Sequence, residues 1–364
     1  MVRCFGAVET EEHAMCRYLR ARKFNVDATL QMMSDRSQLW REGAGHNFYP
    51  NFKDALGTTA VPESVFASQL QLVLGNVTKS CCSIMMYFSA GRVRADGLEC
   101  LAPFDDIPRY VWHLIMHKLS KHIEYLAAKN KRRTIPIEML VVADLGGISL
   151  NSLRRTLKAL EEAMRVLNVF PEVLSHVVLI NVPHYFMPFW PIIRSFVDKD
   201  TAEKFELFAN WERGRQRLLE LVESDKLASD YGGAGQSTGR LMLEQCEPSA
   251  KGIRERQVQT LSCRRGASSV LAEGSISTEA EEFISLRAYA GAWGRSARVY
   301  ADIQTRDGKK CIQLSRDGKD HSHTVFYAQI AGCNDGDIHY SIKIERGKEG
   351  GFVEHLLWVV DVRT

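Results

Sequence analysis

Residues 137–180 read IEMLVVADLGGISLNSLRRTLKALEEAMRVLNVFPEVLSHVVLI, and this stretch predicts the fold class. Residues 137–142 form an almost unbroken apolar run that predicts a buried strand, and residues 177–180 predict a second one. Between them, apolar side chains recur at the alternating three- and four-residue spacing of a helix face: Leu150, Leu153, Leu157, Leu160, Met164 and Leu167. A strand, a helix and a strand in this order predict a parallel βαβ crossover, and hence an α/β sheet with helices against it.

The chain before this unit begins with a helical pattern over residues 11–42. Met15 and Leu19 are four residues apart, and so are Ala28 and Met32, which predicts two short helices. A basic joint separates them and contains Arg20, Arg22 and Lys23. Glycine and proline recur through residues 46–108, so no register is predicted for that segment.

The sequence pattern in the last part of the chain is no longer helical. Residues 231–237 are mostly small residues and predict a flexible segment. From about residue 257, apolar and polar residues alternate with a period of two, which predicts strands. The alternating apolar sets are Val299, Ala301 and Ile303; Phe326, Ala328 and Ile330; Ile338, Tyr340, Ile342 and Ile344; and Leu356, Trp358, Val360 and Val362. Short strands with Asp-Gly and Gly-Gly turns predict a β-sandwich.

Composition limits the classes of function. The chain has 364 residues, 45% hydrophobic and 25% charged, so it can bury a sizeable core in two or three domains. Its net charge of +3 is too small for a protein that binds nucleic acid by neutralising phosphates, so no nucleic acid partner is predicted. The nine Cys form no Cys-x-x-Cys pair, which predicts reduced thiols. Residues 1–9 contain no apolar signal segment, and the sequence predicts a cytoplasmic chain whose membrane contact is peripheral.

No enzyme motif is complete. His113 and His117 have the spacing of a zinc protease helix, but Leu114 stands where that motif places its general base Glu. His321 and His323 beside Asp320 are typical of a polar loop. The sequence has no Gly-x-Ser-x-Gly elbow and no phosphate-binding P-loop, so we expect no catalysis, no metal and no cofactor.

Residues 185–197 are too apolar for one face of a surface helix. The apolar members of the run are Tyr185, Phe186, Met187, Phe189, Trp190, Ile192, Ile193, Phe196 and Val197. Two interpretations stay open from the pattern alone: a helix of the core, or a lid that closes a lipid cavity and meets a membrane with its outer face.

Five motifs in order resemble the CRAL-TRIO lipid-binding family, which includes the yeast phosphatidylinositol/phosphatidylcholine transfer protein. They are Leu19-Arg20-Ala21-Arg22-Lys23-Phe24 with Trp40-Arg41, Asp144-Leu145-Gly146-Gly147-Ile148-Ser149-Leu150, Phe170-Pro171-Glu172, Ile180-Asn181-Val182-Pro183 with the aromatic run, and Asp230-Tyr231-Gly232-Gly233. Two features depart from the pattern: Arg94-Ala95-Asp96-Gly97 replaces a usual strand motif, and Ala228 replaces a usual Pro.

The last part of the chain resembles the GOLD β-sandwich that follows such domains in animal relatives. The resemblance rests on strand order and on Val258, Arg264-Arg265-Gly266, Leu286-Arg287, Asp307-Gly308 and Cys333-Asn334-Asp335-Gly336. Together the two resemblances imply an α/β CRAL-TRIO domain with an N-terminal helical lobe, followed by an all-β GOLD-like sandwich. The implied boundaries are 1–45 for the lobe, 46–235 for the lipid-binding domain, 236–252 for a linker and 253–364 for the sandwich.

The CRAL-TRIO resemblance also implies a ligand. The phosphoinositol-binding positions of the family fall on Arg22, Glu172, Thr201 and Lys204, and all four residue types are retained. The phosphatidylcholine positions, which carry hydroxyls in the yeast protein, fall on Met139 and Val141 and offer no donor. The lid residues expected to face the pocket or the membrane are Phe186, Phe189, Trp190, Ile193 and Phe196, with Phe189 or Trp190 turned outward.

The implied function is phosphatidylinositol binding and transfer between membranes through a gated hydrophobic pocket. Two alternatives stay open: a lipid-sensing adaptor, and a carrier of another hydrophobic ligand such as a tocopherol or retinoid. The expected partners are a phospholipid, a transiently bound membrane surface and a protein partner of the GOLD-like domain.

Overall fold

The computed structural model describes residues 9–45, 63–80, 83–101, 110–112, 114–130, 138–246, 253–264, 271–279, 282–290, 298–305, 308–317, 325–330, 336–345 and 353–363. The chain forms two compact units. The first contains residues 1–55, 67–93 and 105–246, and the second contains residues 56–66, 94–104 and 247–364. The boundary between residues 66 and 67 falls inside helix α4 (Glu63–Leu70), so α4 has residues in both units.

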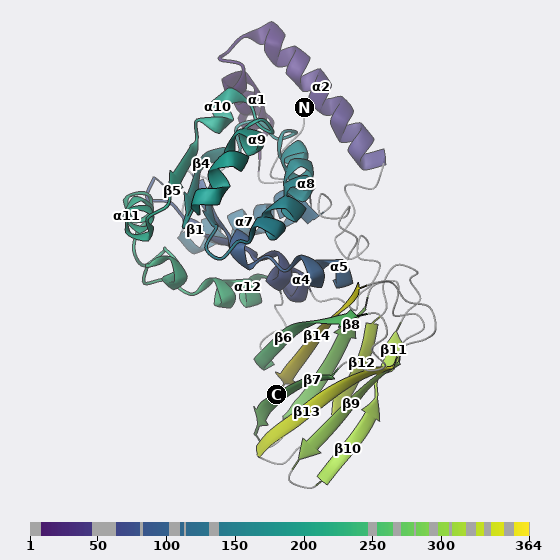
Figure 1. The fold of residues 1–364 in the computed structure, drawn as a ribbon. Helices are drawn as coiled ribbons and strands as arrows, with labels where there is room; N and C mark the ends of the chain where they lie inside the picture. The colour runs from purple at the N-terminus through teal and green to yellow at the C-terminus, as the bar shows by residue number, and fades with distance from the viewer. Residues whose placement is uncertain are drawn as a thin grey trace. The chain divides into compact units, whose positions relative to one another are not determined.

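The first unit is built on a five-stranded sheet with the order β1-β2-β3-β4-β5 (Figure 1). The strands are β1 (Leu72–Val77), β2 (Ser83–Phe88), β3 (Glu138–Asp144), β4 (Leu174–Ile180) and β5 (Phe205–Phe208). β1 is antiparallel to β2, whereas β2, β3, β4 and β5 pair in parallel. Helix α8 (Leu150–Leu167) connects β3 to β4, so the predicted βαβ crossover is confirmed.

Helices cover both faces of this sheet, as the near-continuous apolar strands require. On one face, Met139 and Val141 pack with apolar side chains from η4 (Leu114–Leu119), α7 (Ser120–Asn130), α8, η5 (His184–Phe189) and α9 (Trp190–Arg194). On the other, Leu140 and Val142 pack with side chains from α11 (Trp211–Leu221) and α12 (Thr238–Cys246). The sheet therefore forms the middle layer of three.

Two helices, α1 (Glu11–Ala21) and α2 (Val26–Gly45), precede the sheet, as predicted. Thr10 caps α1, because its side chain accepts a hydrogen bond from the amide of His13 at 3.3 Å. The helix ends at the basic joint, where Lys23 and Phe24 take left-handed φ angles of 50° and 62°. This reversal of the backbone separates the two helices.

Two parts of the first unit differ from the sequence prediction. β1 and β2 lie in the segment for which no register was predicted, and α12 lies inside the predicted linker 236–252. The side-chain amide of Gln245 in α12 accepts from the Leu74 amide at 3.1 Å and donates to the Leu74 carbonyl at 2.6 Å. It thus satisfies backbone groups on the edge strand β1, which needs a partner.

The Asp230-Tyr231-Gly232-Gly233 motif begins inside η6 (Ser229–Tyr231) and has a structural explanation. Gly232 takes a φ of 78°, and a Cβ on Gly233 would lie 2.1 Å from the Leu227 carbonyl oxygen. The preceding Ala228 donates its amide hydrogen to the Tyr87 hydroxyl at 2.9 Å. A proline, as in the motif that the sequence resembles, has no such hydrogen, so this contact depends on the departure from that motif.

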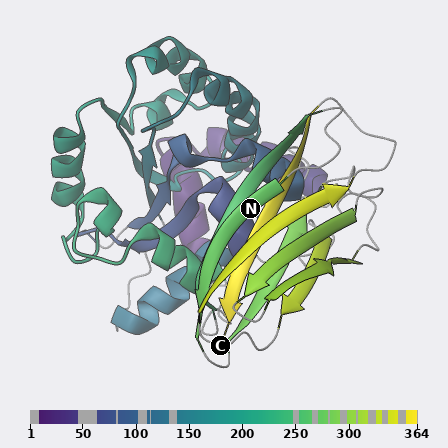
Figure 2. The ribbon, with the colours of Figure 1, turned by 60° about the horizontal axis from the view of Figure 1, so that its bottom comes forward.

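The second unit contains two antiparallel sheets, with the orders β10-β9-β13-β7 and β11-β12-β8-β14-β6 (Figure 2). The strands are β6 (Ile253–Arg264), β7 (Leu271–Thr278), β8 (Phe283–Tyr289), β9 (Arg298–Thr305), β10 (Gly308–Gln313), β11 (Ser315–Asp317), β12 (Val325–Ile330), β13 (Gly336–Glu345) and β14 (Val353–Arg363). One core joins the two sheets and contains the fully buried Trp358 of β14 and Ile342 of β13. The predicted all-β architecture is confirmed, and the GOLD resemblance stays a prediction.

The other face of β14 is also buried. Leu357 and Val359 are fully buried there, and α5 (Ala95–Leu101) packs against β14. Asp361 is buried on the same face and pairs with Arg287 of β8. A stretch that the sequence assigns to the domain 46–235 therefore packs with the β-sheets.

Candidate functional site

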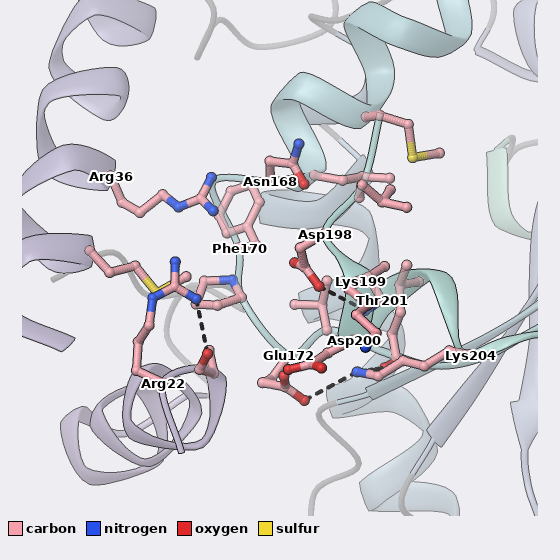
Figure 3. Close-up of a pocket in the computed structure, with 18 residues that line it drawn as sticks. Arg22, Arg36, Asn168, Phe170, Glu172, Asp198, Lys199, Asp200, Thr201 and Lys204 are labelled. Carbon is pink, nitrogen blue, oxygen red and sulfur yellow. Dashed lines mark hydrogen bonds and ion pairs between the residues drawn. The ribbon is translucent and has the colours of Figure 1, made fainter. Parts of the chain in front are cut away.

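A pocket of about 260 Å³ lies in the first unit, between the N-terminal helices and the ends of two strands (Figure 3). One wall comes from α1 and α2. The second comes from the segment that joins α8 to β4, and the third from α10 (Lys199–Ala202) with the residues beside it. The pocket thus depends on three segments that are far apart in the sequence.

All four residues predicted to bind the headgroup line this pocket. Arg22 is the C-terminal cap of α1, Glu172 precedes β4, and Thr201 and Lys204 lie in and just after α10. The ammonium of Lys204 donates to Glu172 Oε2 at 3.1 Å and to the Leu174 carbonyl oxygen at 2.8 Å. The structure brings the four together; the ligand that they bind stays a prediction.

Sequence reasoning missed Arg36, which lines the pocket from α2. In the close-up its side chain extends from the helix toward Phe170 and Asn168 (Figure 3). A signal for it was present, because Arg36 follows Met32 by four residues and therefore shares its helix face. Met32 is a buried residue of the same wall.

The acidic side chains of the pocket have partners, whereas two of its arginines form no ion pair among the described residues. Each acid has a partner: Glu172 pairs with Lys204, Asp198 accepts from the Thr201 amide at 2.8 Å, and Asp200 lies 3.5 Å from Lys23. Among the described residues, the guanidiniums of Arg22 and Arg36 form no ion pair with a carboxylate.

The surroundings of Arg36 disfavour its charged form. Burial lowers the pKa of Arg36, and the nearby charge of Arg22 lowers it further, although Tyr18, Asp198 and Asp35 act in the opposite direction. An anion beside Arg36 would act in the opposite direction to burial and favour its charged form.

A buried ion pair holds the walls together. Arg17 of α1 is 1% exposed; its Nε lies 2.5 Å from Glu9 Oε1, and its Nη1 donates to the Pro171 carbonyl oxygen at 2.6 Å. Pro171 directly precedes Glu172, so Arg17 fixes the position of the loop that carries the carboxylate. The sequence analysis did not identify this positioning residue.

The segment predicted to be a lid folds as η5 and α9, and its orientation corrects the prediction. Phe186 and Ile193 are buried in the core that contains Met139 and Val141. Phe189 and Trp190 are half-buried against the same core, and the Trp190 ring centroid lies 5.3 Å from that of Phe205. The outward orientation expected for Phe189 or Trp190 is therefore wrong in this structure.

The residues that do face outward are others. Tyr185, Met187 and Ile192 are 43%, 52% and 47% exposed. Phe196, also predicted as a lid residue, is half-buried, and its carbonyl oxygen accepts from Asn168 Nδ2 at 3.1 Å. Two prolines, Pro188 inside η5 and Pro191 in the first turn of α9, lie where the 3-10 helix changes to an α-helix.

Other candidate residues lie outside the described part of the structure. His113, Asp320, His321 and His323 are not among the described residues, and neither is the side chain of His117. Within the described ranges, no three His, Cys, Asp or Glu side chains gather as a metal site. No helix in the same ranges is both long and apolar enough to cross a membrane.

Comparison with known families gives this pocket a context. Residues 107–233, which include β3, α8, β4 and the pocket residues from all but the N-terminal wall, match the CRAL/TRIO domain. Residues 5–35, which include α1 and Arg22, match the CRAL/TRIO N-terminal domain. Together the two matches span less than half of the chain. The GOLD resemblance of the second unit has no corresponding family match among these findings.

Curated proteins similar to this chain include phospholipid transfer proteins. The phosphatidylinositol/phosphatidylcholine transfer protein SFH12 of Arabidopsis thaliana is 22% identical over 61% of this chain and 39% of its own length. The Sec14 cytosolic factor of Schizosaccharomyces pombe is 22% identical over 65% of this chain and 80% of its own. The protein real-time of Anopheles gambiae is 23% identical over 62% of this chain and 32% of its own. The chain thus spans well under half the length of the plant and mosquito relatives.

The match to a solved structure, that of Sfh5, is 16% identical and covers 63% of this chain and 78% of the other, with a TM-score of 0.40. A score at this level does not establish a common fold.

Proposed function

We propose that this protein binds phosphatidylinositol, with the headgroup in the pocket, and transfers it between membranes. The observation that carries the proposal is the convergence of Arg22, Glu172, Thr201 and Lys204 on one pocket. They come from three segments separated by up to about 180 residues, and they are the positions that the family resemblance implies. The similar transfer proteins support a lipid as the ligand.

The chemistry of the cluster suits an inositol phosphate headgroup. Glu172 can accept hydrogen bonds from ring hydroxyls, and the Thr201 hydroxyl can donate or accept. Lys204 supplies a positive charge for the phosphodiester, and Arg22 supplies five donors in a fixed fork. Because Lys204 is already held by Glu172 and Leu174, its ammonium is ordered before a ligand arrives.

The pocket has room for a headgroup but not for acyl chains. Its volume of about 260 Å³ is just below the range of roughly 300 to 1,000 Å³ that holds drug-sized ligands. We assign the acyl chains to the apolar layer between the sheet and the lid, where Phe186 and Ile193 now pack with Met139 and Val141. Binding would then require the lid to move away from the sheet.

Transfer requires such an apolar space. A diacyl lipid has about 30 methylenes, and at roughly 0.8 kcal/mol each their exposure to water would cost more than about 20 kcal/mol. The outward Tyr185, Met187 and Ile192 are placed to enter a bilayer surface, and membrane contact would favour the open lid. The protein thereby exchanges lipid without a covalent step.

Phosphatidylcholine fits this layer less well. Met139 and Val141, at the positions that carry hydroxyls in the yeast protein, are buried apolar side chains of the core. They offer no hydrogen bond to a choline phosphate, so we propose that this lipid binds poorly or in another pose. We assign the second unit a GOLD-like role in binding a protein partner or a membrane.

The proposal is tested by transfer between vesicles. Donor vesicles carry labelled phosphatidylinositol or labelled phosphatidylcholine, and acceptor vesicles carry neither. We expect rapid transfer of phosphatidylinositol and transfer of phosphatidylcholine at least about tenfold slower. Absence of phosphatidylinositol transfer would overturn the proposal, and absence of transfer despite stable binding would favour the lipid-sensing adaptor.

A further inference from the structure

The lid is tied to the turn of residues 144–148, which follows β3. Asp144 Oδ1 accepts a hydrogen bond from the Asn181 side-chain amide at 2.8 Å, and Asn181 lies shortly before η5. Within η5, the Tyr185 hydroxyl donates to the Ile148 carbonyl oxygen. A lid that moves away from the sheet must either break this hydrogen bond or carry the turn with it, so movement of the lid acts on the turn.

The same turn is packed against the segment that follows β2. This segment forms η2 (Ala90–Arg92). A Cβ at Gly91 would lie 2.0 Å from the Gly146 carbonyl oxygen and 2.9 Å from the Ile148 amide nitrogen. Glycine permits the two backbones to approach this closely. Because close-packed backbone leaves no space to absorb a displacement, η2 follows a movement of the turn.

The chain passes from η2 directly into α5. The Val93 amide donates to the Ala90 carbonyl oxygen at 3.3 Å, and the Leu98 amide donates to the Arg94 carbonyl oxygen at 3.0 Å. The residue that ends η2 therefore stands next to the residue that begins α5. Val93 belongs to the first unit and Arg94 to the second. Residues 94–97 are also where the sequence departs from the motif that it resembles.

Within the second unit, α5 packs against β14. Leu98 and Leu101 of α5 are 2% and 0% exposed. Leu357 and Val359 of β14 are fully buried on the face away from the core of the two sheets. α5 has seven residues, and a helix this short is marginal in water without packing. A displacement of η2 therefore acts on a helix that depends on its packing.

We propose that α5 couples the lid to the second unit. When the lid opens, the 144–148 turn and η2 shift, and α5 loosens from β14. The lid motion is part of the proposed function, so this inference rests on it. The element with two states is α5, which is packed while the lid is closed and loosened while it is open. The cover on β14 thereby reports the state of the lid to the second unit.

The test follows α5 through the thiol of Cys100, which is 3% exposed. The full chain is treated with N-ethylmaleimide, alone and with vesicles of phosphatidylcholine and phosphatidylinositol. Peptide mass spectrometry gives the alkylation rate of each cysteine. Cys311, an exposed thiol of β10, is the internal reference for the reagent. Phosphatidylinositol transfer between the same vesicles is measured in parallel.

We expect the vesicles to speed up Cys100 alkylation about fivefold, because they favour the open lid, and to leave Cys311 unchanged. Phosphatidylinositol transfer with an unchanged rate at Cys100 would overturn the coupling and leave the proposed function in place. Absence of both transfer and a faster rate at Cys100 would overturn the two together.

Tyr185→Phe tests the link between the lid and the turn. It removes the hydroxyl that binds the turn and keeps an apolar side chain, so the vesicles should accelerate Cys100 alkylation by less than about half as much as in the wild type. Tyr125→Phe, at a tyrosine of α7 that is 57% exposed, is the matched control. A vesicle response as large in Tyr185→Phe as in the control would overturn the coupling.

Gly91→Ala tests the link between the turn and η2. The added methyl group would meet the Gly146 carbonyl oxygen and push η2 away from the turn. Cys100 alkylation should then be about fivefold faster even without vesicles. Gly239→Ala on α12, where a Cβ has no atom within 4 Å, should keep the rate of the wild type. A folded Gly91→Ala with an unchanged rate would overturn the coupling, and Tyr185→Phe decides the question if Gly91→Ala does not fold.

Discussion

Lys204 Nζ lies 3.1 Å from Glu172 Oε2, and this pair stands at the amino ends of two adjacent parallel strands. Glu172 precedes β4 and takes a left-handed φ of 54°, and Lys204 directly precedes β5. The Lys204 carbonyl oxygen also accepts from the Val177 amide at 2.9 Å, so the sheet itself holds the ammonium in place. The pair is thus built by strand pairing and does not depend on a loop alone.

Lys204→Ala is expected to lower phosphatidylinositol transfer about tenfold or more, because it removes the only lysine that the pocket directs at Glu172 among the described residues. The pair is about one fifth exposed, so its loss should cost the fold only about 1 kcal/mol. Transfer is measured between vesicles, and thermal unfolding is measured in parallel. Lys121→Ala, which removes an exposed lysine of α7, is the matched control. Transfer as fast in Lys204→Ala as in the control would contradict the role of Lys204.

Arg17→Met is expected to destabilise the first unit by about 3 to 5 kcal/mol, because it removes the guanidinium that pairs with the buried carboxylate of Glu9. It also removes the contact with Pro171, so phosphatidylinositol binding should weaken in the fraction that stays folded. Urea unfolding measures the first effect. The double variant Glu9→Leu with Arg17→Leu should recover most of the stability, since no buried charge remains unpaired. A single variant as stable as the parent would show that this ion pair does not anchor α1.

Ile192→Glu is expected to abolish binding to vesicles without a large change in thermal stability, because Ile192 is 47% exposed on α9. Trp190→Glu should behave differently and unfold at a clearly lower temperature, because Trp190 packs against Phe205 and the core. Vesicle sedimentation and calorimetry distinguish the two effects. If Trp190→Glu loses vesicle binding at an unchanged melting temperature, Trp190 faces outward and the correction to the lid is wrong.

Alkaline pH should weaken the first unit through Tyr231. Burial raises the pKa of Tyr231 to about 12, with Asp144 adding to the shift and the hydrogen bond with Ser89 opposing it. An unfolded tyrosine has a pKa near 10, so the stabilisation is complete below about pH 10 and is lost as the pH rises toward 12.

The measurement is urea unfolding at pH 9, 10 and 11, for the wild type and for Tyr231→Phe. The free energy of unfolding of the wild type should fall more steeply with pH than that of the variant, by up to about 1.4 kcal/mol for each pH unit. Parallel slopes would show that Tyr231 does not remain neutral in the folded state at these pH values.

The βαβ unit and most strands of the second unit could be predicted because their apolar spacing is regular. Ser149 even caps α8 at the residue before the predicted stripe begins, accepting from the Ser152 amide at 3.0 Å. β1 and β2 could not be predicted in the same way. Gly75 lies inside β1. A Cβ in its place would lie 2.7 Å from the Tyr87 ring, so this glycine allows close packing and does not mark a turn.

The headgroup cluster was predicted only through the resemblance, since no local pattern relates Arg22 to Glu172 or Lys204. Their proximity arises from the pairing of β4 with β5 and from the buried contact of Arg17 with Pro171. The lid was misjudged for a related reason. A count of apolar residues in 185–197 shows that two faces are apolar, but the change from the 3-10 helix η5 to the α-helix α9 determines which residues face outward.

Mass spectrometry of the lipid that copurifies with the protein tests the central claim most directly. The wild type and Lys204→Ala are purified from the same cells, and bound lipid is extracted and quantified per mole of protein. We predict phosphatidylinositol, with or without ring phosphates, as the main lipid of the wild type, and at least about tenfold less of it in Lys204→Ala. Phosphatidylcholine, a tocopherol or a retinoid as the main ligand, or equal amounts of phosphatidylinositol in both proteins, would contradict the claim.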